Sequence, residues 1–343
     1  MKKWLRRVIA VLLLGGGALA AVAAWLWHDL QTNLDQPIVL HGNSELFTIE
    51  RGSSLAGLAS RLARAGWIKH AYYLRFEARR LGIGGRIQAG LYEIPDGATP
   101  RELLQKFVAG DVKTFTITFI EGATFREMLT VLARHPYLEQ SLQELDTAGI
   151  LARVAPGLDH PEGWFFPSTY RFSAGQSDAD ILRRAHAQLV EILDRSWIER
   201  RPDLPYAEPV DALIMASIIE KETGRADERA LIAGVFVRRL EKGMKLQTDP
   251  TVIYGLGDAF DGNLRRTDLE TDTPYNTYTR PGLPPTPIAM PGEAAIRAAL
   301  NPAAGDALYF VGKGDGSHVF SRTLAEHNAA VRRYQLPGGR RDQ

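Results

Sequence analysis

The chain has 343 residues, 24% of them charged and 45% hydrophobic, which indicates a globular protein long enough for at least two domains. Its formal net charge of +1 lacks the strong positive excess of nucleic-acid-binding proteins, so no nucleic acid is expected as a partner. Cysteine is absent, which excludes disulfides, thiolate catalysis and zinc–thiolate sites.

The N-terminus predicts a membrane anchor over residues 1–28. Basic residues at positions 2, 3, 6 and 7 precede an uncharged apolar stretch at 8–27, long enough to cross a hydrocarbon core of about 30 Å. The positive-inside rule then places the N-terminus in the cytoplasm and the rest of the chain in the periplasm or its equivalent, with the anchor in the inner membrane. A cleaved signal peptide is the alternative, because Ala-x-Ala occurs at 18–20 and 21–23. The apolar run continues past these sites to Trp27, which favours an uncleaved anchor.

Two folded regions are predicted after a polar linker at 29–44. In residues 45–112, a strand at 45–50, two helices and a strand at 90–95 give the strand–helix–helix–strand order of a LysM-like module. Its aromatic residues at helical spacing are interpreted as core, so no binding residues are assigned there.

The larger region, residues 113–337, predicts an α+β domain and is followed by a tail at 338–343. Irregular loops are expected at 265–290, and a hairpin turn joins two strands at 312–316. Strands are expected at 114–120, 307–311 and 318–321, and helices at 141–145, 178–195, 210–224, 227–242, 249–254, 291–300 and 323–334.

The helix predicted at 210–224 is the centre of this domain. Residues 212–219 contain one polar side chain, Ser217, so apolar side chains surround the helix axis and predict burial on all sides. Glu220 follows directly on the face of Ser217, whereas Glu222 lies on roughly the opposite side. A single carboxyl emerging from a buried helix has a raised pKa and suits general acid catalysis. The alternative is a helix-end glutamate that reaches solvent.

Several other chemistries are excluded because the sequence lacks their motifs. The eight histidines are scattered without a metal-binding pattern, no G-x-S-x-G motif is present, and the glycine-rich 312–316 segment has no helix to bind phosphate. Neither a metal nor a cofactor is expected.

Three stretches combine aromatic and polar side chains, as binding of a sugar chain requires. They are residues 161–172 with Glu162 and Tyr170, residues 246–254 with Gln247, Asp249 and Tyr254, and residues 273–278 with Tyr275, Asn276 and Tyr278. Each is equally consistent with a buried turn held by tyrosine and asparagine hydrogen bonds.

The same stretches carry a family resemblance. ASIIEKET (216–223), LQTDPTVIYGLG (246–257), TPYNTY (273–278), EGWFFPSTY (162–170) and the segments at 282–302 and 308–328 resemble the endolytic murein transglycosylases, the YceG-like family. The resemblance implies that Glu220 is catalytic. It makes Ser217 and the eight aromatic or polar residues of the three stretches named above substrate-binding candidates. Two positions depart from the family pattern, Ser168 in place of the usual Asp and Thr286 in place of the common Gly.

The implied activity is cleavage between N-acetylmuramic acid and N-acetylglucosamine within peptidoglycan strands. One carboxyl suffices, because the sugar's own 6-hydroxyl replaces water and closes a 1,6-anhydro ring. By family analogy the enzyme acts on nascent strands, beside peptidoglycan synthases (penicillin-binding proteins). The alternatives are a muramidase-type hydrolase, with Asp249 or another carboxylate activating water, and a non-catalytic peptidoglycan-binding scaffold.

Overall fold

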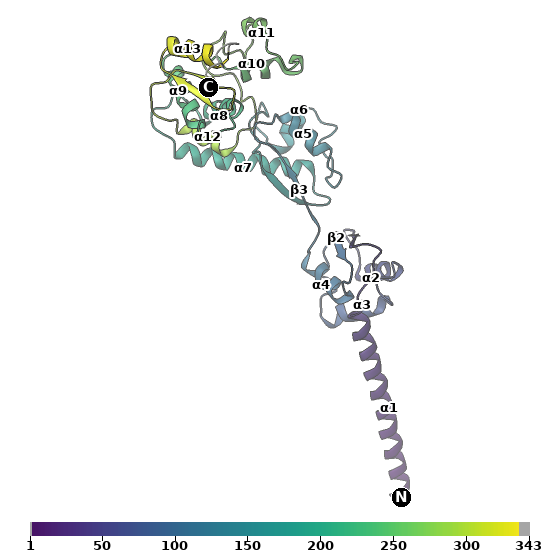
Figure 1. Cartoon of the computed structure of the whole chain (residues 1–343). Helices are drawn as coiled ribbons and strands as arrows, with labels where there is room; N and C mark the ends of the chain where they lie inside the picture. The colour runs from purple at the N-terminus through teal and green to yellow at the C-terminus, as the bar shows by residue number, and fades with distance from the viewer. Residues whose placement is uncertain (1, 336–343) are drawn as a thin grey trace. The chain divides into compact units, whose positions relative to one another are not determined.

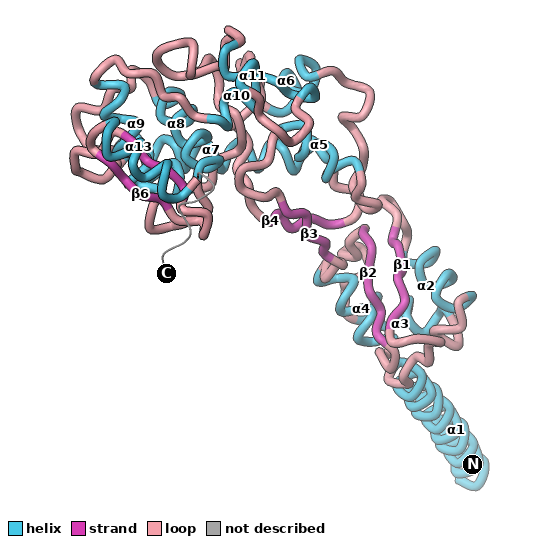
Figure 2. Tube along the Cα trace, turned by 45° about the horizontal axis from the view of Figure 1, so that its top comes forward, coloured by secondary structure: helices cyan, strands magenta, loops and turns pink. Residues whose placement is uncertain are grey.

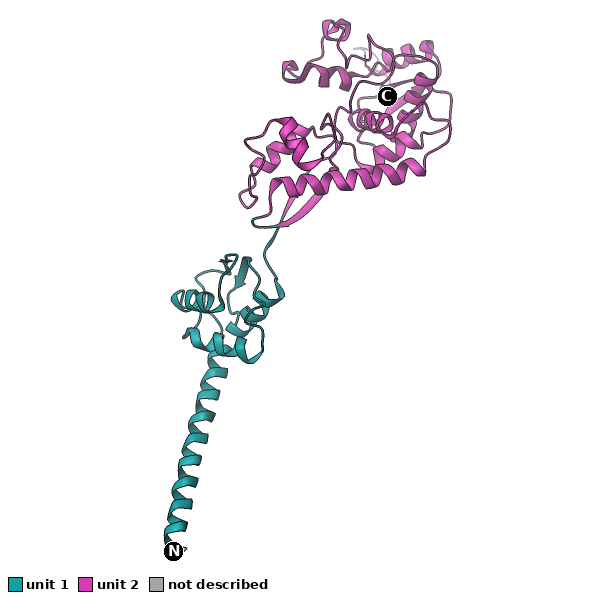
Figure 3. Cartoon of the chain, turned by 180° about the vertical axis from the view of Figure 1, so that it is seen from behind, with its two compact units in different colours: residues 1–115, 173–175 teal, residues 116–172, 176–343 magenta. Residues whose placement is uncertain are grey.

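The computed structural model describes residues 2–335 as two compact units (Figure 3). Unit 1 comprises residues 1–115 and 173–175, and unit 2 comprises residues 116–172 and 176–343. Within the described residues the strands form three two-stranded sheets among many helices, so the fold is mixed α and β, as predicted (Figure 2).

Unit 1 contains one antiparallel β-ribbon and four helices. Strand β1 (Ser44–Ile49) pairs with β2 (Gly90–Pro95), with Ser44 opposite Pro95 and Ile49 opposite Gly90. The helices are α1 (Lys2–Leu34), α2 (Leu55–Arg64), α3 (Ala71–Arg80) and α4 (Pro100–Ala109). Ser54 caps α2 and Thr99 forms a capping box with Glu102 at the start of α4, as short amphipathic helices require.

Among residues 2–335, α1 is the one helix long and apolar enough to cross a membrane, with a mean hydropathy of 2.3 over its most apolar window. Its last turns belong to the core of unit 1, where Leu30, Leu34 and Ile38 are buried. The polar linker predicted at 29–44 is therefore ordered at its start. The buried aliphatic residues Leu30, Leu34 and Ile38 recur every four positions, which is a helical spacing. The polar residues between them make the composition of this segment resemble that of a linker.

Unit 2 is built around α8 (Pro209–Glu222), in which residues 212–219 are all buried, as predicted (Figure 1). It packs against α7 (Asp178–Ile198), α9 (Arg229–Glu241), α10 (Asp249–Leu256) and α12 (Glu293–Leu300). The remaining elements are β3 (Thr114–Thr118), α5 (Phe125–Ala133), α6 (Thr147–Val154), β4 (Thr169–Ser173), the short 3₁₀ turn η1 (Gly257–Ala259), α11 (Arg266–Glu270), β5 (Tyr309–Gly312), β6 (His318–Ser321) and α13 (Leu324–Tyr334).

Three local predictions in unit 2 are wrong. No helix forms at 141–145, because the Asp178 carboxylate takes the backbone N–H groups of Ser141 and Leu142, and α6 begins later behind its Asp146 cap. Strand β4, which pairs with β3, was not predicted. The loop at 265–290 contains the one-turn helix α11.

Candidate active site

The C-terminal turn of α8 presents Glu220, Lys221 and Glu222 to three different surroundings. Glu220 is enclosed, with 6% of its side chain exposed. Its Oε2 accepts a hydrogen bond of 2.9 Å from Gly292 N, and its Oε1 lies 3.8 Å from the Arg229 guanidinium. Burial raises the pKa of Glu220 and the nearby Glu121 carboxylate adds to the rise, while the Gly292 N–H and Arg229 oppose it. As the helical period predicts, Glu222 faces elsewhere.

Glu222 lines a cavity of about 430 Å³, and Glu220 does not. Thr248 donates a hydrogen bond to Glu222 Oε1 through its hydroxyl. This cavity, called the Glu222 cavity below, collects polar side chains from α8, α9, the start of α10, the 273–278 loop, the β5–β6 hairpin and α13. They are Glu222, Arg239, Gln247, Asp249, Tyr278, Tyr309, His318 and His327.

The electrostatics of this cavity suit a carboxyl that exchanges a proton near neutral pH. Burial raises the pKa of Glu222 to about 7; the Thr248 hydrogen bond opposes the shift, the Asp249 charge reinforces it, and His318 and Arg239 oppose it. The Asp249 carboxylate is held in position by the Tyr278 hydroxyl, which donates a 2.5 Å hydrogen bond to its Oδ1. A carboxyl that is half protonated near pH 7 can both give and accept a proton during one reaction.

The backbone at Gln247 adds a second sign of function in the Glu222 cavity. Gln247 has φ 51°, in the left-handed region that side chains other than Gly rarely adopt. Its N–H is fixed by Thr277 O at 3.1 Å, and its side chain lines the cavity. Such conformations cost roughly 1–2 kcal/mol and cluster at functional sites, because the surrounding structure must hold them in place.

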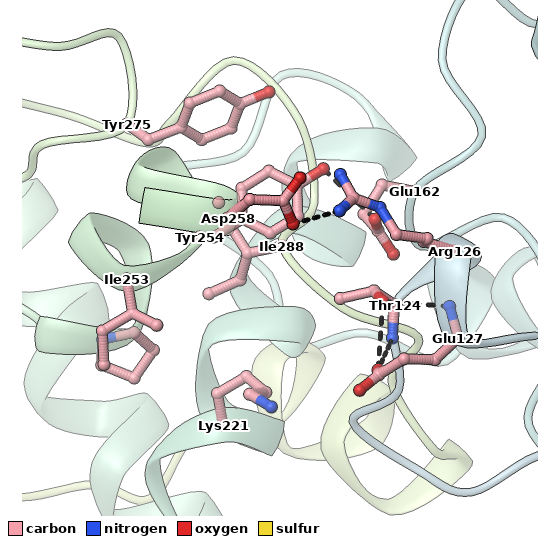
Figure 4. Close-up of a pocket in the computed structure, with 12 residues that line it drawn as sticks. Thr124, Arg126, Glu127, Glu162, Lys221, Ile253, Tyr254, Asp258, Tyr275 and Ile288 are labelled. Atoms are coloured by element: carbon pink, nitrogen blue, oxygen red, sulfur yellow. Dashed lines mark hydrogen bonds and ion pairs between the residues drawn. The ribbon is translucent and has the colours of Figure 1, made fainter. Parts of the chain in front are cut away.

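A second, larger cavity of about 740 Å³ contains Glu162, Tyr254 and Tyr275 (Figure 4). Glu162 is 4% exposed; its Oε1 accepts from Phe125 N at 3.0 Å and its Oε2 from the Tyr254 hydroxyl at 3.2 Å. Burial raises the pKa of Glu162 to about 7, against the effect of both hydrogen bonds. Because both oxygens already have donors, Glu162 holds the start of α5 in place in addition to lining this Glu162 cavity.

Three predicted saccharide contacts lie outside the linings of both cavities. The Tyr170 hydroxyl donates to Phe166 O at 2.7 Å, and Ser217 Oγ donates to Ile214 O while accepting from Ile288 N. The Asn276 amide donates to three backbone carbonyls in the 268–271 turn. These groups are buried and bonded within the protein, so they shape the walls of the site without facing a ligand.

The structure therefore divides the predicted site residues between two cavities. Gln247, Asp249 and Tyr278 line the Glu222 cavity, and Glu162, Tyr254 and Tyr275 line the other. Glu222 and the histidines of the C-terminal elements were not among the predicted site residues. The available signal was the position of Glu222 as the last residue of α8, two residues further than Glu220 from the buried apolar run 212–219. No group of three or more potential metal ligands occurs among residues 2–335.

Comparison with known proteins identifies the class to which this architecture belongs. The model of the YceG-like family matches residues 47–333, so the chain belongs to the YceG-like family, which confirms the prediction. An endolytic murein transglycosylase of Bacillus subtilis is 34% identical over 304 residues, covering 83% of each chain. The enzyme of the same name from Streptococcus pneumoniae is 26% identical over 358 residues, covering 91% of this chain and 63% of the relative.

A solved structure supports the fold. The crystal structure of a YceG-like protein from Listeria monocytogenes is 30% identical in sequence and aligns with a TM-score of 0.52. The alignment covers 83% of this chain and 98% of the Listeria chain, so the likeness extends over nearly the whole of the Listeria chain.

Proposed function

We propose that this chain is a membrane-anchored lytic transglycosylase that cuts peptidoglycan glycan strands internally, with Glu222 as its acid. Its relatives, 34% and 26% identical, carry the name endolytic murein transglycosylase. The observation that carries the assignment of the acid is that Glu222 shares one cavity with Gln247, Asp249 and Tyr278, whereas Glu220 is enclosed by Gly292 and Arg229.

The chemistry requires one carboxyl that changes protonation twice. Protonated Glu222 donates its proton to the glycosidic oxygen between N-acetylmuramic acid and N-acetylglucosamine, and the bond from that oxygen to C1 of the muramic acid breaks. The Glu222 carboxylate then takes the proton of the muramic acid 6-hydroxyl, whose oxygen bonds to C1 and closes the 1,6-anhydro ring. The acid is regenerated and no water is consumed.

The neighbouring side chains support this cycle. The Thr248 hydroxyl fixes one oxygen of Glu222, which leaves the other free for the substrate. Arg239 and His318 favour the carboxylate that forms after the first proton transfer, and the Asp249 charge favours its reprotonation.

The decisive experiment compares Glu220→Gln with Glu222→Gln in the full chain, using intact glycan strands and mass analysis of the products. We expect Glu222→Gln to reduce the release of anhydro ends at least 100-fold, whereas Glu220→Gln should retain most of the activity. The reverse result would return the catalytic role to Glu220, as the sequence prediction has it. Full activity in both variants would exclude both glutamates as the acid, and the absence of anhydro ends from the wild-type protein would favour the non-catalytic scaffold.

A hydrolase remains the second candidate because Asp249 lies in the same cavity as Glu222. Two carboxyl groups at one site can activate water instead of using the sugar hydroxyl. The Asp249 carboxylate accepts from Tyr278, which fits a supporting role better than that of a base. Reducing ends in the products, lost in Asp249→Asn, would establish hydrolysis.

The proposal extends to the location and the domain roles, which the family placement supports. Helix α1 acts as the anchor, with the N-terminus cytoplasmic and residues 113–337 forming a catalytic domain on the extracytoplasmic side. The 45–112 region serves as a LysM-like module, on the basis of its strand–helix–helix–strand order. The tethered enzyme acts on nascent strands and ends their growth, in company with the peptidoglycan synthases. Fractionation and protease accessibility in intact spheroplasts test the orientation.

A further inference from the structure

We infer that the Glu162 cavity is a second saccharide site, which holds uncharged N-acetylhexosamine residues of the glycan strand apart from the bond that is cut. The identity of this ligand as a glycan rests on the proposed function. The site itself rests on four independent features of the cavity: its size, its lining, the pairing of its charges and its shared walls with the Glu222 cavity.

The size and lining of the cavity are those of a ligand site. Its volume of about 740 Å³ lies within the 300–1,000 Å³ typical of small-molecule sites, which combine apolar and aromatic walls with a few polar groups. Pro250, Ile253 and Ile288 supply apolar surface, and the rings of Tyr254 and Tyr275 stand 5.0 Å apart in an edge arrangement. Such surfaces suit the C–H faces of sugar rings.

The charged groups at the cavity already have ion-pair or hydrogen-bond partners within the protein. Arg126 forms an ion pair with Asp258 (Figure 4). Lys221 Nζ donates to Gly122 O at 3.1 Å. Glu127 accepts hydrogen bonds from the backbone and hydroxyl of Thr124, its capping partner at the start of α5. Because the lining holds no more cations than carboxylates, the cavity favours a neutral ligand over a stem peptide, whose carboxylates would need unpaired cations.

The buried acid fits a hydroxylated ligand. Glu162 and the Tyr254 hydroxyl form a hydrogen-bonded pair that lines the cavity, and protonation of Glu162 would add a donor for a sugar hydroxyl or acetamido oxygen. Burial raises the pKa of Glu162 to about 7, so the protonated form is well populated near neutral pH.

Three segments contribute to both cavities, which places the two sites side by side. Lys221 and Glu222 are consecutive on α8, and α10 directs Asp249 to one cavity and Tyr254 to the other. The 273–278 loop is divided in the same way, with Tyr275 in the Glu162 cavity and Tyr278 in the Glu222 cavity. A polymer held in one cavity is therefore close to the second.

Isoleucine- and valine-methyl NMR on full-length Glu222→Gln protein in detergent micelles tests the inference, with chitotetraose as the probe. We expect shifts at Ile253 and Ile288, with the exposed Ile198 as an internal control. The Ile253→Trp variant fills the cavity and should weaken chitotetraose binding at least tenfold. The matched control, Leu231→Trp on the exposed face of α9, should leave the affinity unchanged.

The possible outcomes are distinct. Shifts confined to residues of the Glu222 cavity such as Val311, or unchanged affinity in Ile253→Trp, would overturn the second site. Shifts at Ile253 with a free stem peptide but not with chitotetraose would overturn the saccharide assignment. If chitotetraose binds at Ile253 while the wild-type protein releases no anhydro ends, the second site stands and the proposed activity fails.

Discussion

Two glutamates, separated by one residue on α8, have different surroundings although burial raises the pKa of both. Glu220 is sealed by the Gly292 N–H and by Arg229, and it ties α8 to the start of α12. Glu222 lies where the helix ends and its side chain reaches a cavity. A raised pKa alone therefore does not identify a catalytic acid; access to a ligand distinguishes the two.

The buried carboxyl of Glu162 makes stability depend on pH. Its pKa is about 7 in the folded protein and near 4.5 in the unfolded chain, so the folded state binds more protons between these values. Stability accordingly falls as pH rises from about 4.5 to about 7, by at most roughly 3 kcal/mol for this group. Glu162→Gln lacks this titration, so its Tm relative to wild type should rise by several degrees between pH 5 and pH 8.

Differential scanning calorimetry at both pH values measures the effect of Glu162→Gln. The exposed Glu144→Gln variant serves as the control and should show the same Tm difference from wild type at both pH values. Equal behaviour of the two variants would show that Glu162 titrates as an ordinary surface carboxyl.

Gln247 allows backbone strain and side-chain function to be separated. Replacing Gln247 by Gly removes the unfavourable left-handed conformation of a residue with a side chain, so the Tm should stay within a few degrees of wild type or rise. Loss of the side chain from the Glu222 cavity should nevertheless lower transglycosylase activity at least tenfold. Asp203→Gly, at an exposed position with φ 60°, is the matched control and should leave activity unchanged. Retained activity in Gln247→Gly would show that the Gln247 side chain does not contribute to the site.

At the scale of elements, α9 approaches the segment after α12 so closely that only Gly fits at position 234. A Cβ there would lie 2.5 Å from the carbonyl oxygen of Ala303. Gly234→Ala should therefore lower the Tm, since overpacking costs about 1–3 kcal/mol and outweighs the gain of about 1 kcal/mol in helix propensity. Thermal denaturation checks this against Gly224→Ala, where an added Cβ meets no atom within 4 Å. A higher Tm in Gly234→Ala would show that the segment at Ala303 moves to accommodate the added Cβ.

The elements differ in how well the sequence predicts them. Helix α8 was predictable because a helix with apolar side chains all round its axis is stable only when it is buried on all sides. The helix expected at 141–145 was not, because its backbone donors bind Asp178, which lies far away in sequence. Likewise, the motifs containing Gln247, Tyr254 and Tyr278 identified residues near the site. Their division between two cavities depends on tertiary contacts that no local spacing encodes.

At the scale of the whole molecule, the apolar helix α1 continues into the core of unit 1. Leu34 is 1% exposed within the core of unit 1, although it lies in a stretch whose composition predicts a linker. Leu34→Ala should destabilise unit 1 by about 2–5 kcal/mol, as for other buried leucines. Val39→Ala, which alters a side chain that is 87% exposed in the same stretch, should cost less than about 0.5 kcal/mol. Hydrogen exchange of unit 1 amides measures the loss of stability in both variants. Equal protection in the two variants would support the prediction that residues 29–44 are a linker.

Polar contacts strengthen this connection between helix and domain. Tyr73 on α3 donates a hydrogen bond to Asp29, and Arg101 on α4 contacts both Gln31 and Asp35 through its guanidinium. Because α1 continues from its apolar stretch into these contacts without a break, no swivel exists between them. In the proposed membrane-anchored enzyme, any tilt or rotation that the lipid imposes on α1 therefore also reorients the β1–β2 ribbon. Under that proposal, the thickness and order of the bilayer help to determine the direction in which unit 1 faces.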